Sequence, residues 1–137
     1  VVEQSKDNPV FYVQYAHART RSLRRRFAEA GFSEGAAPDL SLLDDEELAL
    51  VKLGAQFPRT VEAAAVNHEP HRIAFYLGDL AAAFHALWNR GNDDPSRRFI
   101  VEDEALSRAR LALADAIGQI IRNGLAVMGL RAAEELN

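Results

Sequence analysis

The spacing of apolar residues predicts α-helices along almost the whole chain. Apolar side chains recur at intervals of three, four and seven residues, for example at Leu106, Leu113, Ile117 and Ile120. This spacing places them on one face of a helix, whereas the alternation typical of a strand is almost absent. The predicted helices cover, approximately, residues 9–30, 44–56, 59–67, 70–90 and 102–128.

Residues that favour helix ends flank these segments. Asn8 before Pro9 is a good N-cap and first-turn pair. Asp44 and Glu47 have the spacing of a capping box, with aspartate in the position of the usual Ser or Thr. Gly91 follows the fourth segment and predicts its end.

The helices form one unit. A chain of 137 residues suits a single domain with a real core. The loops expected at residues 35–38 and 91–98 are too short to divide it. The predicted fold is therefore all-α: a single-domain antiparallel bundle of about five helices over residues 1–137.

The first predicted helix has two faces that could be covered. Its core stripe consists of Tyr12, Ala16, Leu23 and Phe27. A second stripe, on another face, consists of Phe11, Tyr15, Ser22 and Arg26, and Arg19 lies on its border. One helix cannot easily bury both stripes, so the second would present aromatic rings beside guanidinium groups, as single-strand RNA platforms do. Alternatively, the two rings pack on the last helix. We expect that packing for Phe11 and leave both readings open for Tyr15.

The fourth predicted helix carries two further aromatic candidates. Its core side consists of Ile73, Leu77, Leu80, Phe84 and Leu87. Tyr76 and Trp88 lie on opposite borders of that stripe, roughly 120° apart on a helical wheel, so they cannot share one patch on this helix. Trp88 lies near the helix end beside a polar loop, which favours it as the ligand-facing ring. Arg72 in the first turn is more simply explained by a surface salt bridge than by a partner.

The charge is distributed unevenly. With 16 Lys plus Arg and 20 Asp plus Glu, the chain has a formal net charge of −4. Residues 1–30 carry +3 and residues 31–137 carry −7. The total argues against a general nucleic-acid coat, whereas the basic segment indicates an anionic partner at one end. The plainer interpretation of that segment is a solvated helix face.

Several classes of function have no support in the sequence. The chain has no Cys, which excludes disulfides and cysteine-based sites. It lacks the Gly-rich phosphate loop and the other short catalytic motifs, and proline between His68 and His71 argues against a metal site. No apolar run could span a bilayer, so we expect a cytoplasmic protein without a membrane partner. The chain begins at Val1, so we expect it to be a piece of a longer protein.

Blocks spread over nearly the whole chain resemble a known family. They are residues 7–19 (DNPVFYVQYAHAR), 69–72 (EPHR), 76–84 (YLGDLAAAF), 110–116 (RLALADA), 121–125 (IRNGL) and 128–130 (MGL). In this order they resemble the C-terminal, anticodon-binding (DALR) domain of arginyl-tRNA synthetase, a class I aminoacyl-tRNA synthetase. The closing residues 133–137 depart from the family pattern, because they lack its proline and methionine.

The resemblance implies a helical domain that binds the anticodon arm of arginine tRNA. The upstream catalytic domain of the same enzyme would then attach arginine to that tRNA using ATP and Mg²⁺, and this chain carries neither cofactor nor catalytic residue. The resemblance, together with the basic run, marks five residues for RNA contact: Tyr15, Arg19, Arg26, Tyr76 and Trp88.

Two other functions fit the same residues. The chain could be a freestanding RNA-binding relative without catalytic activity, or a helical protein-interaction module whose basic run is incidental. An upstream catalytic domain in the full gene argues for the synthetase. Binding of tRNA that ignores the anticodon argues for the interaction module.

Overall fold

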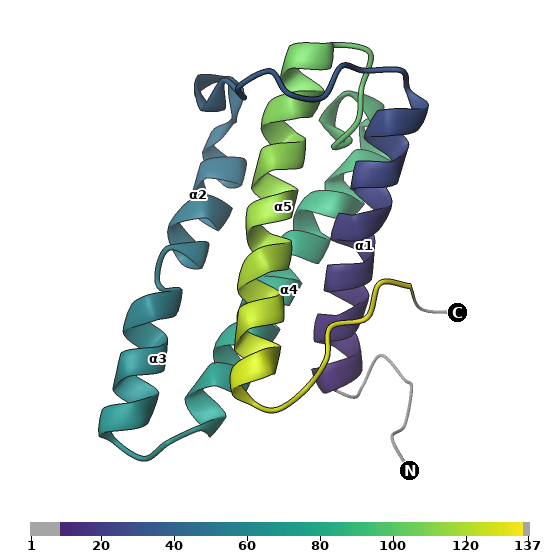
Figure 1. Ribbon diagram of the computed structural model, residues 1–137. Helices are drawn as coiled ribbons and strands as arrows, with labels where there is room; N and C mark the ends of the chain where they lie inside the picture. The colour runs from purple at the N-terminus through teal and green to yellow at the C-terminus, as the bar shows by residue number, and fades with distance from the viewer. Residues whose placement is uncertain (1–8, 136–137) are drawn as a thin grey trace.

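The computed structural model describes residues 9–135, and its regular structure is entirely helical over that range (Figure 1). Its elements are α1 (Pro9–Glu29), η1 (Leu40–Leu42), α2 (Asp45–Gly54), α3 (Phe57–Val66), α4 (His71–Asp93), η2 (Pro95–Arg97) and α5 (Glu104–Val127), where η denotes a short 3₁₀ turn. The five helices predicted from the sequence are confirmed. The proposed cap at Asn8 lies outside the described residues.

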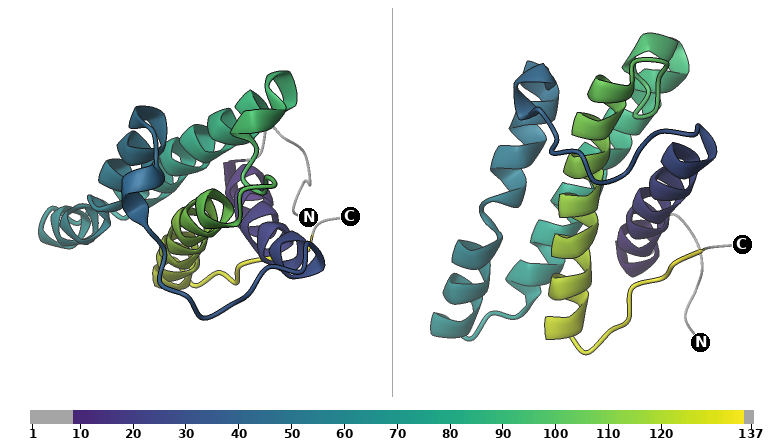
Figure 2. Two further views of the ribbon diagram at one scale, coloured as in Figure 1. Left: turned by 90° about the horizontal axis from the view of Figure 1, so that it is seen from above. Right: turned by 45° about the horizontal axis from the view of Figure 1, so that its top comes forward.

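The chain runs up α1, down α2 and α3, up α4 and down α5, so the bundle is antiparallel (Figure 1). Only two residues separate α2 from α3, and the two follow one another as a broken rod beside α4. Seen from above, α5 lies between α1 and α2 (Figure 2). The last described residues, up to 135, turn back from the end of α5 and run along α1.

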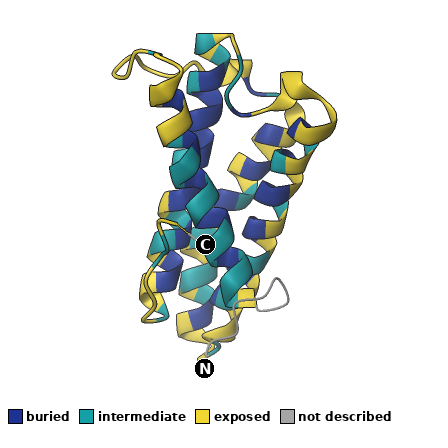
Figure 3. Cartoon of the chain, turned by 90° about the vertical axis from the view of Figure 1, so that its right-hand side faces the viewer, coloured by how far each residue is buried: buried dark blue, intermediate teal, exposed yellow. Residues whose placement is uncertain are grey.

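The core lies where α1, α4 and α5 face one another. Its fully buried side chains include Phe27 of α1, Leu80 and Phe84 of α4, and Ile117 and Ile121 of α5. Buried positions recur along one side of α1, α2, α4 and α5, with exposed positions along the other side (Figure 3), as the helical spacing of apolar residues predicts. Burial of this apolar surface is the main term that holds the bundle together.

The predicted end of the fourth helix, at residue 90, is wrong by three residues. α4 passes through Gly91 and ends at Asp93. Gly91 serves a different purpose, because a Cβ there would lie 3.0 Å from the backbone Cα of Arg98. The glycine therefore lets the loop after α4 fold back onto the helix, and part of that loop is the turn η2.

A buried ionic cluster joins α2, α4, α5 and the loop after α4. The capping box is confirmed, since Asp44 accepts from the Glu47 amide and Glu47 accepts from the Asp44 amide, both at 2.9 Å. The free carboxylate oxygen of Glu47 then accepts from Arg110 Nε at 2.8 Å and lies 3.4 Å from Arg90 Nη2. Arg110 also donates to the carbonyl of Arg98 at 2.6 Å. One guanidinium thus fixes the position of the loop that packs on Gly91.

Among residues 9–135 no helix is long and apolar enough to cross a bilayer. The same residues contain no group of three His, Asp or Glu side chains arranged to hold a metal ion.

Candidate nucleic-acid interface

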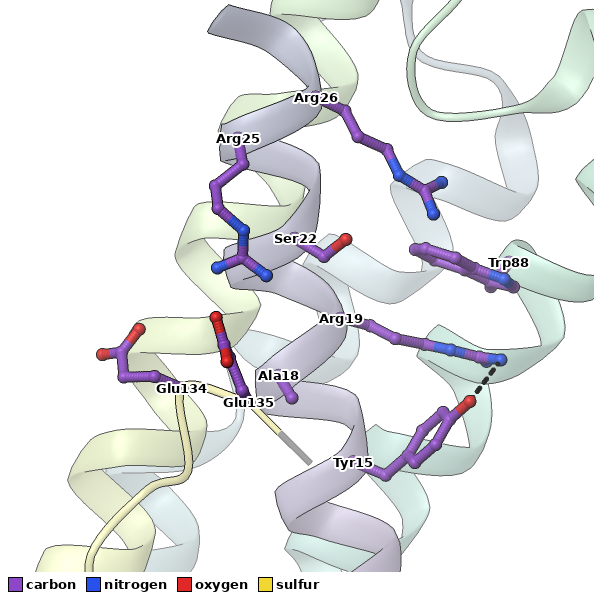
Figure 4. Close-up of a pocket in the computed structure, with 9 residues that line it drawn as sticks. All are labelled: Tyr15, Ala18, Arg19, Ser22, Arg25, Arg26, Trp88, Glu134 and Glu135. Atoms are coloured by element: carbon purple, nitrogen blue, oxygen red, sulfur yellow. Dashed lines mark hydrogen bonds between the residues drawn. The ribbon is translucent and has the colours of Figure 1, made fainter. Parts of the chain in front are cut away.

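Four side chains from α1 and α4 form a single column on the surface of the bundle (Figure 4). The guanidinium of Arg19 lies 4.4 Å from the ring centre of Tyr15 and 4.5 Å from that of Trp88. The guanidinium of Arg26 lies 5.2 Å from the Trp88 ring. The order along the column is therefore Tyr15, Arg19, Trp88 and Arg26, in which cations alternate with aromatic rings. We call these four residues the stacking column.

Arg19 is held firmly within the column. Its Nη2 donates to the Tyr15 hydroxyl at 3.1 Å, and its Nη1 lies 2.9 Å from Nδ1 of His85. Arginine can only donate, so Nδ1 of the buried His85 is the acceptor and its proton resides on Nε2. That Nε2 faces the Tyr12 carbonyl at 3.4 Å. Arg26, in contrast, is exposed and contacts the column only through the Trp88 ring.

Trp88 is supported from the core. Its ring centre lies 6.4 Å from that of Phe84 and 6.4 Å from that of Phe99, both buried. Tilted aromatic pairs at this separation stabilise one another beyond the area that they bury. The indole is thus half-buried and fixed in orientation, with its faces turned toward the two arginines.

The column borders a cavity of about 360 Å³, whose lining also includes Ser22 and Arg25. Arg19, Arg25 and Arg26 form no ion pair with a carboxylate of the described residues. Arg21 and Arg24, on the same helix, are neutralised by Glu134 and Asp115 at 2.9 and 2.5 Å. The free positive charge of α1 is therefore concentrated beside the aromatic rings.

The carboxyl-terminal segment is fastened along α1 next to this cavity. The Gln14 amide bridges it, donating to the Arg131 carbonyl at 2.5 Å and accepting from the Ala133 amide at 2.6 Å. The fully buried His17 ring lies between Ala133 O, 2.5 Å from Nδ1, and Arg122 Nη1, 2.9 Å from Nε2. Since Arg122 can only donate, Nδ1 carries the proton and donates to Ala133. Glu134 and Glu135 then lie at the rim of the cavity (Figure 4).

The geometry around His17 predicts a pH-dependent stability. Burial lowers the pKa of His17 from its ordinary 6.5, the Arg122 charge lowers it further, and the bond to Ala133 opposes them. As the pH falls below about 6.5, His17 is protonated in the unfolded chain before it is protonated in the folded one. Its contribution to the free energy of unfolding is therefore fully present above that pH and is lost as the pH falls toward the folded-state pKa. Urea unfolding should give a lower free energy of unfolding at pH 5 than at pH 7.5. In His17→Gln the difference between the two pH values should be smaller. An unchanged pH dependence in the variant would contradict the assignment.

The structure brings together four of the five residues predicted to contact RNA. Tyr15, Arg19, Arg26 and Trp88 line one cavity, but Tyr76 lies in the core. The Tyr76 hydroxyl donates to the carbonyls of Leu53 and Gly54 at the end of α2, at 2.7 and 3.0 Å, and burial raises its pKa to about 12. We therefore leave Tyr76 out of the binding surface.

Phe11 was expected to pack on the last helix, but the contacts of its ring are with α1 and α4. Its ring centre lies 6.2 Å from that of Tyr15, and it lines a small cavity with His85 and Asn89 of α4. Phe11 thus extends the aromatic surface beyond the stacking column. Sequence reasoning missed His85, which holds Arg19, because a lone histidine on an apolar face carries no signal of its partner.

Comparison with known proteins identifies the family. The sequence matches the family model of the DALR anticodon binding domain over residues 13–136. The chain belongs to this family. The resemblance inferred from the sequence blocks is thereby confirmed.

Relatives of this DALR domain are synthetases. It is 66% identical over 137 residues to the arginine–tRNA ligase of Novosphingobium aromaticivorans, covering 99% of this chain and 23% of that protein. It is 57% identical over 143 residues to that of Parvibaculum lavamentivorans, covering 99% and 24%. This DALR domain therefore spans about a quarter of the length of these curated relatives.

A solved structure shares the fold of this DALR domain. It superimposes on Thermus thermophilus arginyl-tRNA synthetase with a TM-score of 0.82 and 36% sequence identity, covering 97% of this chain and 22% of that one. The all-α bundle predicted from the sequence is confirmed by this match.

Proposed function

We propose that this DALR domain binds the anticodon arm of arginine tRNA as one part of an arginyl-tRNA synthetase. The observation that supports the proposal best is the stacking column, in which two aromatic rings and two guanidinium groups from separate helices meet beside unneutralised positive charge. Unpaired bases stack on aromatic rings and on guanidinium planes, and arginine holds the phosphates between them.

The two arginines of the column have different roles in this proposal. Arg19 is fixed by Tyr15 and His85, so it serves as a permanent spacer between the two rings. Arg26 is exposed, and within residues 9–135 its guanidinium is held by the Trp88 ring alone, so it can swing aside. An unpaired base then stacks on the indole face that Arg26 leaves, and the displaced guanidinium contacts an adjacent phosphate.

The aminoacylation itself belongs to the parent enzyme. We propose that a catalytic domain upstream in the same polypeptide attaches arginine to tRNA with ATP and Mg²⁺, since the relatives of four times this length are named arginine–tRNA ligases. This chain would contribute tRNA binding alone. A cytoplasmic location follows from that activity.

Removing the central ring should weaken RNA binding. Stacking on one aromatic ring contributes about 1–3 kcal/mol per base, so Trp88→Ala should raise the Kd for an arginine anticodon stem-loop by about 5- to 150-fold. Fluorescence anisotropy at fixed salt measures the Kd, and far-UV circular dichroism checks that the variant is folded. Trp88→Phe keeps a ring and should retain part of the affinity.

The same titration separates the proposal from its alternatives. A matched control is Phe75→Ala, which removes an aromatic ring that is 69% exposed on α4 and outside the column, and it should leave the Kd unchanged. If a folded Trp88→Ala protein bound as tightly as the wild type, the column would not be the binding surface. Equal affinity for arginine tRNA and for an anticodon variant would favour a protein-interaction module.

A further inference from the structure

A second cavity adjoins the first on the other side of Arg26. Its volume is about 490 Å³, and it shares Arg26 and Trp88 with the cavity described above. Its remaining polar lining comes from Asn92 at the end of α4 and Arg98 in the loop that follows. Leu23 and Phe99 close its floor, and both are buried.

Asn92 is placed to contact the edge of a molecule lying on Trp88. It follows Trp88 by four residues, which puts the two side chains on the same face of α4. The residue is exposed, and its amide has no hydrogen-bond partner among the described residues. An amide group offers a donor beside an acceptor, which is the pattern that base edges present.

Arg98 supplies a positive charge at a fixed position. Its Nε donates to the Gly91 carbonyl at 3.2 Å, and its own carbonyl accepts from Arg110 at 2.6 Å. Its guanidinium forms no ion pair with a carboxylate of the described residues, whereas the adjacent Arg97 is 3.4 Å from Asp94. The close approach to Gly91 therefore holds an unneutralised guanidinium at the mouth of the cavity.

We propose that this second cavity is a nucleotide subsite in which the Asn92 amide binds the edge of one unpaired base and Arg98 binds a phosphate of the same strand. This subsite rests on the proposed RNA-binding function and extends it past the stacking column. Arg26 forms the partition between the two cavities, so a strand that displaces it can occupy both. The subsite makes Asn92 a residue that determines base specificity.

A panel of anticodon stem-loops, each lacking the base at one loop position, tests the role of Asn92. For the wild-type chain, removing the base that reaches the subsite should raise the Kd about tenfold. Asn92→Ala should raise the Kd for the intact loop by a similar factor. In this variant, removing the base that reaches the subsite should no longer change the Kd, whereas removing any other base should have the same effect as in the wild type. Asn67→Ala, at the distant end of α3, is the matched control.

Salt dependence tests the role of Arg98 separately. Arg98→Met keeps the aliphatic stem that packs on Gly91 and removes the charge. Loss of one phosphate contact should lower the slope of log Kd against log salt by about 0.7 for every loop sequence in the panel. Arg59→Met makes the same charge change on α3, outside both cavities, and should leave the slope unaltered.

The outcomes distinguish the subsite from the broader function. If wild type binds the intact loop and Trp88→Ala weakens binding, but Asn92→Ala responds to every abasic loop as the wild type does, the subsite is rejected and the RNA-binding function stands. If the wild-type chain shows no preference for the arginine anticodon loop, both proposals fall. Loss of one position's effect in Asn92→Ala with an unchanged slope in Arg98→Met would reject the phosphate contact alone.

Discussion

Arg110→Ala should lower the free energy of unfolding by about 3 kcal/mol, because it leaves the buried Glu47 carboxylate without its best partner. The Glu47 side chain is 2% exposed and that of Arg110 is 7% exposed. Arg90 remains 3.4 Å from the carboxylate, so part of the charge stays compensated. The variant also releases the carbonyl of Arg98, which loosens the loop after α4. Urea unfolding followed by circular dichroism measures the change.

An exposed ion pair supplies the comparison. Arg97 pairs with Asp94 at 3.4 Å and more loosely with Asp44 at 3.6 Å, and all three side chains are at least a third exposed. Arg97→Ala should therefore change the unfolding free energy by less than about 1 kcal/mol. The interpretation of Arg110 would be wrong if the two alanine variants were equally stable. The double variant Arg110→Met with Glu47→Gln removes both charges and should recover part of the loss.

Phe84→Ala should lower the unfolding free energy by about 3–5 kcal/mol, since it deletes a fully buried ring and leaves a cavity at the centre of the bundle. The same ring supports Trp88 and Phe99, with centre separations of 6.4 and 5.3 Å. We therefore expect weaker binding of the anticodon stem-loop as well, even at temperatures where the variant is folded. Thermal unfolding and anisotropy titration measure the two effects.

The control for this variant lies on the same helix. Phe75→Ala removes an identical side chain from a position that is 69% exposed, so its effect on stability should stay within about 0.5 kcal/mol. A loss in Phe75→Ala comparable to that in Phe84→Ala would show that α4 is stabilised by its own sequence more than by core packing.

Local chemistry was enough to predict the helices but not all of their ends. The capping box at Asp44 and Glu47 is a contact between residues three apart, so the sequence alone could reveal it. The prediction that the helix ends before Gly91 is wrong, because the role of this glycine depends on Arg98, which packs against it after the chain has turned. A glycine before a polar loop predicts a helix end. Only the fold shows that a glycine is needed here because Arg98 approaches the helix backbone closely.

The candidate site was predictable as a set of residue types and not as an arrangement. Helical spacing places Tyr76 and Trp88 on opposite borders of α4, and in the sequence only the polar loop beside Trp88 favours one ring over the other. The choice is made by the end of α2, whose carbonyls accept from Tyr76, and by α1, whose arginines cover Trp88. Contacts such as His17 to Ala133 join residues 116 positions apart, beyond the reach of any local pattern.

The placement of Arg19 and Arg26 against the indole has a consequence for the free domain. A bare tryptophan face beside other aromatic rings would be an adhesive apolar patch, which promotes association with unrelated proteins. Here a charged guanidinium covers each face: Arg19 stays in place, and the exposed Arg26 is the group that an incoming base can replace. The domain can thus keep its recognition surface ready between encounters without becoming prone to aggregation.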